Sequence, residues 1–163
     1  MIFVYLYGLM IVLALIHIVS SRTPRTLHRV IELFLLYLLI GMGICGILAF
    51  IAHVFYAAQT AEYIGWPAGS PFQYEVGIAN LGLGILGILC IWARRNFWLA
   101  TIIMNGAFAW GAAYGHVKQM ILYANYHPGN AGPVFYIDLL LPLITIVLFI
   151  IYRISEEKFS CKP

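Results

Sequence analysis

Long apolar segments with almost no charges restrict the folding of this chain more than any motif does. A helix needs about 20 apolar residues to cross a bilayer. Five segments meet this length, and they cover residues 2–20, 30–58, 71–92, 97–123 and 134–154. Only 9% of the 163 residues are charged, whereas soluble domains have about 25%. The sequence therefore predicts an all-α integral membrane bundle of about five transmembrane helices. It forms a single domain over residues 1–163, with the lipid bilayer as its partner.

The basic residues predict how the segments are oriented. Eight of the nine Lys and Arg residues precede the second segment, join the third to the fourth, or end the chain. Five spans place these three regions on one side, which the positive-inside rule makes cytoplasmic. The ninth, Lys118, lies near the outer end of the fourth segment, where it can snorkel outward. We expect a cell-membrane protein with its amino terminus outside, its carboxyl terminus in the cytoplasm and its first segment kept as an uncleaved anchor.

Neither the cysteines nor the net charge indicates a soluble binding function. Cys45, Cys90 and Cys161 form no CxxC pair, so a zinc site or a disulfide framework is not predicted. We expect Cys45 and Cys90 to act as small packing residues. The formal charge of +3 is too scattered to indicate a nucleic-acid partner.

Polar and ionisable side chains gather at the expected outer ends of the later segments. Such groups are costly in lipid, so they usually face the bundle interior, pair together and mark a site. We expect Glu75 or Asp138 to pair with His116 or Lys118. The candidate ligand-binding residues are Glu75, Asn80, His116, Asn130 and Asp138, and the secondary candidates are His53, Asn105, Lys118 and Gln119. Solvation at the headgroup level is the alternative explanation for each.

Small residues recur at helical spacing in the third and fourth segments. One stripe contains Gly77, Asn80, Gly84 and Gly87, and the other contains Asn105, Ala109, Ala112, His116 and Gln119. Because small residues let helices approach closely in membranes, we expect these two segments to pack face to face. Plain packing with interhelical hydrogen bonds and a binding cavity both fit the pattern.

A proline in the fifth segment adds one feature. Pro142 cannot donate a hydrogen bond to the carbonyl of Asp138. That turn would present a carboxylate beside a freed carbonyl, which gives either a hydrogen-bonding and cation-coordinating corner or a simple kink.

Part of this pattern resembles a known family. It comprises residues 72–84, which read FQYEVGIANLGLG, followed by Gly115-His116, Asn130 and Asp138. These residues resemble an uncharacterised bacterial family of small multi-pass membrane proteins, a domain of unknown function, over the last three segments. The chain is more distantly similar to the DoxX-like four-helix membrane proteins, some of which are associated with quinone-linked sulfur oxidation. The resemblance implies the fold and nominates Glu75, Asn80, His116, Asn130 and Asp138, but it implies no activity.

Several functional classes stay open. We expect a module that binds or transports a proton, cation, lipid or other small molecule in an outer-leaflet pocket, rather than an enzyme. A membrane oxidoreductase component with haem or quinone is the alternative, because His53 and His116 could approach each other. An accessory subunit whose small-residue stripes bind another membrane protein or a second copy is a further class. Glu75, His116 and Asp138 together could bind a metal, but their spacing does not identify one.

Overall fold

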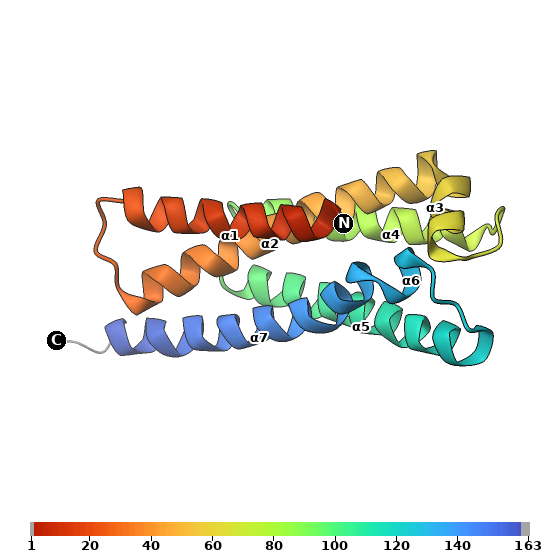
Figure 1. Ribbon diagram of the computed structural model, residues 1–163. Helices are drawn as coiled ribbons and strands as arrows, with labels where there is room; N and C mark the ends of the chain where they lie inside the picture. The colour runs from red at the N-terminus through yellow and green to blue at the C-terminus, as the bar shows by residue number, and fades with distance from the viewer. Residues whose placement is uncertain (1, 161–163) are drawn as a thin grey trace.

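The computed structural model describes residues 2–160, with side chains as far as Glu156. Five long helices run along a bundle, namely α1 (Ile2–Ser20), α2 (Leu27–Phe55), α4 (Phe72–Leu89), α5 (Asn96–Tyr123) and α7 (Pro133–Ser160). Two short helices, α3 (Ala57–Ile64) and α6 (Pro128–Ala131), lie towards one end (Figure 1). No strand occurs within these residues, so the prediction of an all-α bundle is confirmed. Cys161, Lys162 and the side chain of Lys158 lie outside the described part.

Within residues 2–160, four helices have the length and apolar composition needed to cross a membrane. They are α1, α2, α4 and a stretch, Pro128–Glu156, that contains most of α7. These four helices suggest a membrane location. With 28 residues, α5 is also long enough, but it is less apolar and does not meet the same criterion. The count of five spans therefore stays a prediction.

The most extensive contact between helices joins α2 to α4, where glycines face glycines. A Cβ atom added to Gly87 of α4 would lie 2.5 Å from the backbone nitrogen of Gly43, and one added to Gly46 would lie 2.8 Å from the nitrogen of Gly84. The glycine stripe of α4 therefore packs on α2. The expected face-to-face packing of the third and fourth segments is wrong, because α4 and α5 make little contact. Glycines on both α2 and α4 allow the two backbones to meet, which favours this pair.

The other half of the bundle is built from α5 and α7, which pack along each other (Figure 1). Gly106 of α5 faces the ring of Pro142, since a Cβ atom added there would lie 3.4 Å from the proline Cβ. The indole Nε1 of Trp110 donates to the carbonyl of Leu139 across the same contact, at 3.2 Å. Pro142 does not end α7, which continues as one helix through it.

The two halves meet in an apolar core towards the end of the bundle where the chain terminates. Residues of α2, α5 and α7 form this core, together with Cys90 at the end of α4, and its largest members include Leu35, Leu39, Trp98, Ile102, Phe149 and Tyr152. Trp98 is fully buried, and its Nε1 donates to the carbonyl of Cys90 at 2.9 Å. The core therefore fixes α2, α4, α5 and α7 relative to one another at this end.

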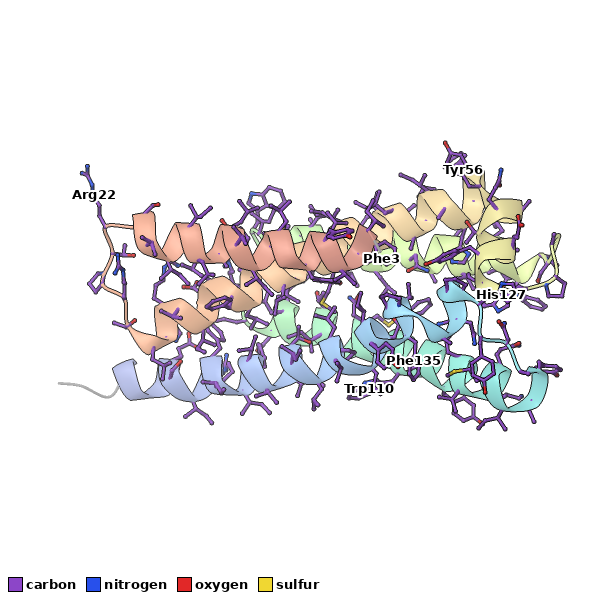
Figure 2. All side chains as sticks on the ribbon, viewed as in Figure 1. Phe3, Arg22, Tyr56, Trp110, His127 and Phe135 are labelled. Carbon is purple, nitrogen blue, oxygen red and sulfur yellow. The ribbon has the colours of Figure 1, made fainter. Side chains whose placement is uncertain are left out.

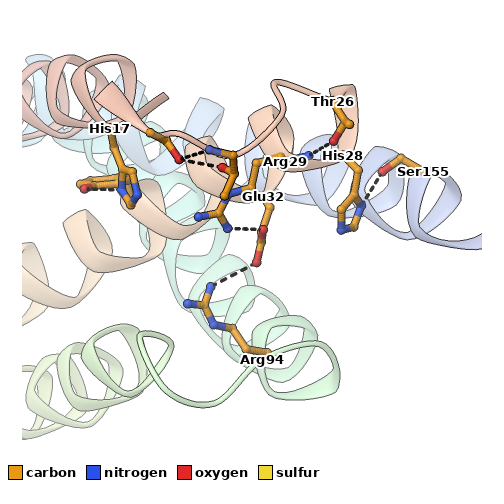
Figure 3. Close-up of polar contacts among 10 residues, drawn as sticks. His17, Thr26, His28, Arg29, Glu32, Arg94 and Ser155 are labelled. Carbon is orange, nitrogen blue, oxygen red and sulfur yellow. Dashed lines mark hydrogen bonds and ion pairs between the residues drawn. The ribbon is translucent and has the colours of Figure 1, made fainter. Parts of the chain in front are cut away.

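Ion pairs extend the same end of the bundle, which we call the basic end after Arg22, Arg25, Arg29, Arg94, Arg95 and Arg153. Glu32 of α2 accepts from Arg29 at 2.7 Å and lies 3.7 Å from Arg94, which precedes α5 (Figure 3). Glu156 of α7 lies 2.7 Å from Arg95. Figure 2 places Arg22 at this end too. Basic residues from three distant parts of the sequence therefore meet in space.

At the opposite end, which we call the capped end, short helices and loops cover the bundle. The expected segment 30–58 is broken here, because α2 ends at Phe55 and α3 begins after Tyr56. The hydroxyl of Thr60 in α3 donates to the carbonyl of Ala52 at 2.8 Å, and this carbonyl also accepts from the backbone nitrogen of Tyr56, so the bond ties α3 to the end of α2. Gln73 of α4 donates to the carbonyl of Ala57 at 2.7 Å and ties α3 to α4.

Candidate functional site

A cavity of about 1180 Å³ separates the two halves of the bundle between its middle and the capped end. Most of its lining is apolar, and the residues come from α1, α2 and α4 on one side and from α5 and α7 on the other. The cavity lies where α4 and α5 make little contact, and Ile2 and Phe3 at the start of α1 border it. Figure 2 shows Phe3 near the middle of the bundle and His127 at the capped end. Gln59 of α3 and Asn130 of α6 border the cavity at the capped end.

A polar cluster of His116, Asn130 and Asp138 forms part of the cavity wall. The Nδ1 of His116 donates to the Oδ1 of Asn130 at 2.8 Å, and the two side chains are buried. The Nε2 of His116 lies 3.7 Å from the Oδ2 of Asp138, which is longer than a hydrogen bond. A neutral imidazole that donates through Nδ1 presents only a lone pair at Nε2. A donor group from a bound molecule can therefore bond to Nε2 or to the carboxylate.

Asn125, which was not among the candidate residues, connects this cluster to the end of α3. Its Nδ2 donates to the carbonyl of Ile64 at 3.0 Å, at the end of α3. The Nδ2 of Asn130 donates to the carbonyl of Asn125 at 2.8 Å and to that of His116 at 3.3 Å. Turn-forming residues surround Asn125 in the sequence, and they give no sign of this role. We call this set, Asn125, Asn130 and His116, the clasp.

Two glycines allow α3 and α6, the short helices of the capped end, to pack closely around the clasp. Gly65 follows α3 with a φ of 80°, a left-handed conformation that glycine adopts without strain. A Cβ atom added there would lie 2.6 Å from the Oδ1 of Asn125. Gly129 of α6 lies against Tyr63 of α3 in the same way, with 2.6 Å to the ring for an added Cβ atom. Side chains at either position would push α3 and α6 apart.

Asn80 and Asn105 both border the cavity, as the sequence predicted for side chains directed into the bundle. They do not form hydrogen bonds between helices through their amide nitrogens. Asn80 donates to the carbonyl of Val76 at 2.8 Å, and Asn105 donates to the carbonyl of Thr101 at 3.0 Å. Each amide therefore satisfies its own nitrogen within its helix and can present its oxygen to the cavity.

Glu75 is the primary candidate that the structure separates from the others. Its side chain is exposed on α4 and does not border the cavity. The expected pairing of Asp138 with His116 is present, but Glu75 takes no part in it. The three ligands considered for a metal, Glu75, His116 and Asp138, are not brought together, and residues 2–160 hold no group of three or more His, Cys, Asp or Glu side chains suited to a metal ion.

The secondary candidates His53, Lys118 and Gln119 border the cavity towards the capped end. His53 and His116 thus reach the same cavity. The Nδ1 of His53 is buried without a hydrogen-bond partner, and its ring lies 6.1 Å from that of Trp66. Lys118 is exposed at the border of the cavity and forms no ion pair with any described side chain.

These features define a class, which is an all-helical bundle with apolar helices of membrane-spanning length and a cavity between its two halves. The chain belongs to a family of unknown function (DUF6790), whose model matches residues 1–158. The match agrees with the resemblance to an uncharacterised domain. Comparisons with curated proteins and with solved structures find no match.

Proposed function

We propose that this chain is an integral membrane protein of five spans that binds an amphipathic small molecule in its cavity. The observation that carries the proposal is the cavity itself, which combines a mostly apolar lining with the His116, Asn130 and Asp138 cluster. The basic end faces the cytoplasm under the positive-inside rule, and the capped end faces outward. The amino terminus is then outside and the carboxyl terminus inside the cell.

Helix lengths support a position for the cavity near the outer surface. The 19 residues of α1 extend over about 28 Å, close to the thickness of the hydrocarbon core, whereas the 29 residues of α2 extend over about 44 Å. Figure 1 shows α1 starting near the middle of the bundle. If α1 spans the hydrocarbon, the capped end projects beyond it, and the cavity extends from the hydrocarbon to the headgroup level.

The size of the cavity supports an occupant. The cavity measures about 1180 Å³, and its lining is mostly apolar. Pockets for drug-sized molecules measure about 300–1,000 Å³. The space is therefore large enough to hold an apolar molecule of that size.

The polar cluster supports an occupant with a hydrogen-bond donor. When the imidazole of His116 is neutral, its Nε2 and the carboxylate of Asp138 are both acceptors, and a hydroxyl group that reaches them can donate to one of the two. The same geometry weighs against His116 as a haem ligand, because Asn130 already holds its Nδ1 and Asp138 faces its Nε2. The glycine stripe of α4 packs on α2 and is therefore not free to bind another protein, which weakens the case for an accessory subunit.

A neutral amphiphile, 1-dodecanol, tests whether the cavity binds ligands. We expect it to raise the Tm of the detergent-solubilised protein by about 5–10 °C at a hundred times its Kd. Gly111→Leu should abolish the increase, because Gly111 borders the cavity and a side chain there meets open space. Gly82→Leu is the matched control, since Gly82 also faces open space but does not border the cavity. An equal increase in all three proteins would mean that dodecanol acts through the micelle, and the proposal would fail.

Reporter tags test the orientation independently. A periplasmic and a cytoplasmic reporter fused to each terminus in turn should place the two termini on opposite sides of the membrane. Two termini on the same side would rule out five spans.

A further inference from the structure

We infer that the occupant of the cavity is an anionic phospholipid whose phosphate pairs with Lys118. This inference rests on the proposed function and adds the chemical class of the ligand. The acyl chains would lie along the apolar lining, between α4 and α5, and the headgroup would lie at the border of the cavity near the capped end.

Charge complementarity at the cavity border is the first argument. The six arginines within the described part of the chain all belong to the basic end, which leaves Lys118 as the one fixed positive charge near the capped end. It borders the cavity and pairs with no described carboxylate. Glu62 and Glu75, the exposed acidic residues of the capped end, do not border the cavity. An anionic group at Lys118 therefore meets an unpaired cation. Among the described acidic residues, only Asp138 of α7 borders the cavity, and its carboxylate faces His116.

Depth is the second argument. Near the start of α1, Tyr7 lies against α2, since a Cβ atom added to Gly41 would lie 3.0 Å from its ring, and Phe3 borders the cavity. If the start of α1 marks the outer limit of the hydrocarbon, Met42 lies within it, and Lys118, in the last two turns of α5, lies towards the headgroup level. Lysine side chains near helix ends reach to this level. A phospholipid has the same order of groups, with its chains in the hydrocarbon and its phosphate above them.

The shape and volume of the cavity provide the third argument. Pockets for ordinary small molecules measure about 300–1,000 Å³, and this cavity is larger, at about 1180 Å³. It is bordered on α5 by Ala107 and Gly111, which are exposed, so the cavity opens to the surface beside them. This opening gives a lipid lateral access from the bilayer.

Native mass spectrometry of the full chain tests the inference. The protein is reconstituted into bilayers of equal phosphatidylglycerol and phosphatidylcholine and then transferred to detergent, and the lipid that remains bound is identified. We expect one retained phosphatidylglycerol in preference to phosphatidylcholine. A basic side chain near the surface contributes about 1 kcal/mol to anionic lipid binding, so Lys118→Gln should reduce the preference about fivefold. Lys118→Arg should retain it.

Two control variants locate the lipid. Arg22→Gln removes an exposed charge at the basic end and should leave the preference unchanged. Gly111→Leu should lose both lipids, whereas Gly82→Leu should keep them. Equal retention of the two lipids by the wild type, an unchanged preference in Lys118→Gln, or unchanged retention in Gly111→Leu would overturn the inference. The proposed function would survive each of these results if dodecanol still stabilised the wild type and not Gly111→Leu.

Discussion

Replacement of Asn130 by alanine gives the sharpest test of the clasp. The side chain of Asn130 is completely buried and makes three hydrogen bonds, to the ring of His116 and to the carbonyls of His116 and Asn125. Alanine fits the helical backbone of α6 but makes none of these bonds. The variant should therefore loosen the cap without changing the charge of the protein.

The expected loss follows from the number of bonds. Hydrogen bonds between helices in membrane proteins contribute about 0.6 kcal/mol on average and at most about 1.7 kcal/mol. Three such bonds give a loss of roughly 2 kcal/mol, with an upper value of about 5 kcal/mol. For a protein of this size, 2 kcal/mol lowers the Tm by about 4–8 °C.

Thermal unfolding in detergent, followed by far-ultraviolet circular dichroism, measures this loss. Asn105→Ala is the matched control, because Asn105 is also buried but bonds only to Thr101 within its own helix. We expect the control to lose less than half as much as Asn130→Ala. If both variants unfold at the same temperature, the hydrogen bonds of the clasp do not stabilise the cap and the reasoning is refuted.

Further predictions concern backbone geometry. Gly87→Ala should lower the free energy of unfolding by about 1–3 kcal/mol, because its Cβ atom would lie 2.5 Å from the nitrogen of Gly43. In the same unfolding experiment the control Gly82→Ala, whose Cβ atom meets open space, should lower it by no more than about 0.5 kcal/mol. Equal losses in the two variants would contradict the packing of α2 on α4. Ala124 ends α5 with a φ of 49°, so Ala124→Gly should raise the free energy of unfolding by roughly 1 kcal/mol in a thermal denaturation series, and a decrease would show that this turn carries no strain.

The positions of the long helices along the sequence could be predicted, because hydropathy and length do not depend on which helices become neighbours. The choice of neighbours could not. The glycines of α4 were matched with small residues of α5, but Gly43 and Gly46 of α2 offer a closer approach. Small-residue stripes show that a helix can approach another closely and leave open which one. The break at Tyr56 was also missed, since the residues around it are apolar enough to continue a helix.

The candidate site was predicted in part for a similar reason. His116, Asn130 and Asp138 come together, and Glu75 does not. Five residues separate Glu75 from Asn80, which places them roughly 140° apart around a helix. When Asn80 faces the cavity, Glu75 must therefore face away from it. Its depth and the family resemblance both suggested that Glu75 belonged to the site, but the rotation of α4 places its side chain outside the cavity wall.

The composition of α5 also follows from its position beside the cavity. No stretch of 18 residues within α5 is apolar enough for it to be counted with the apolar spans. Its polar residues Asn105, His116 and Gln119 border the cavity, however, and do not need to meet lipid. The side chains on its exposed surface are largely apolar, and they include Ile103, Met104, Trp110, Tyr114, Val117 and Ile121. A helix with this division can cross a bilayer beside a cavity, because lipid contacts only its apolar face. The mean hydropathy of the helix describes neither its apolar face nor its polar face. The same division links the proposed five spans to the cavity, since a spanning α5 needs a surface inside the bundle for Asn105, His116 and Gln119.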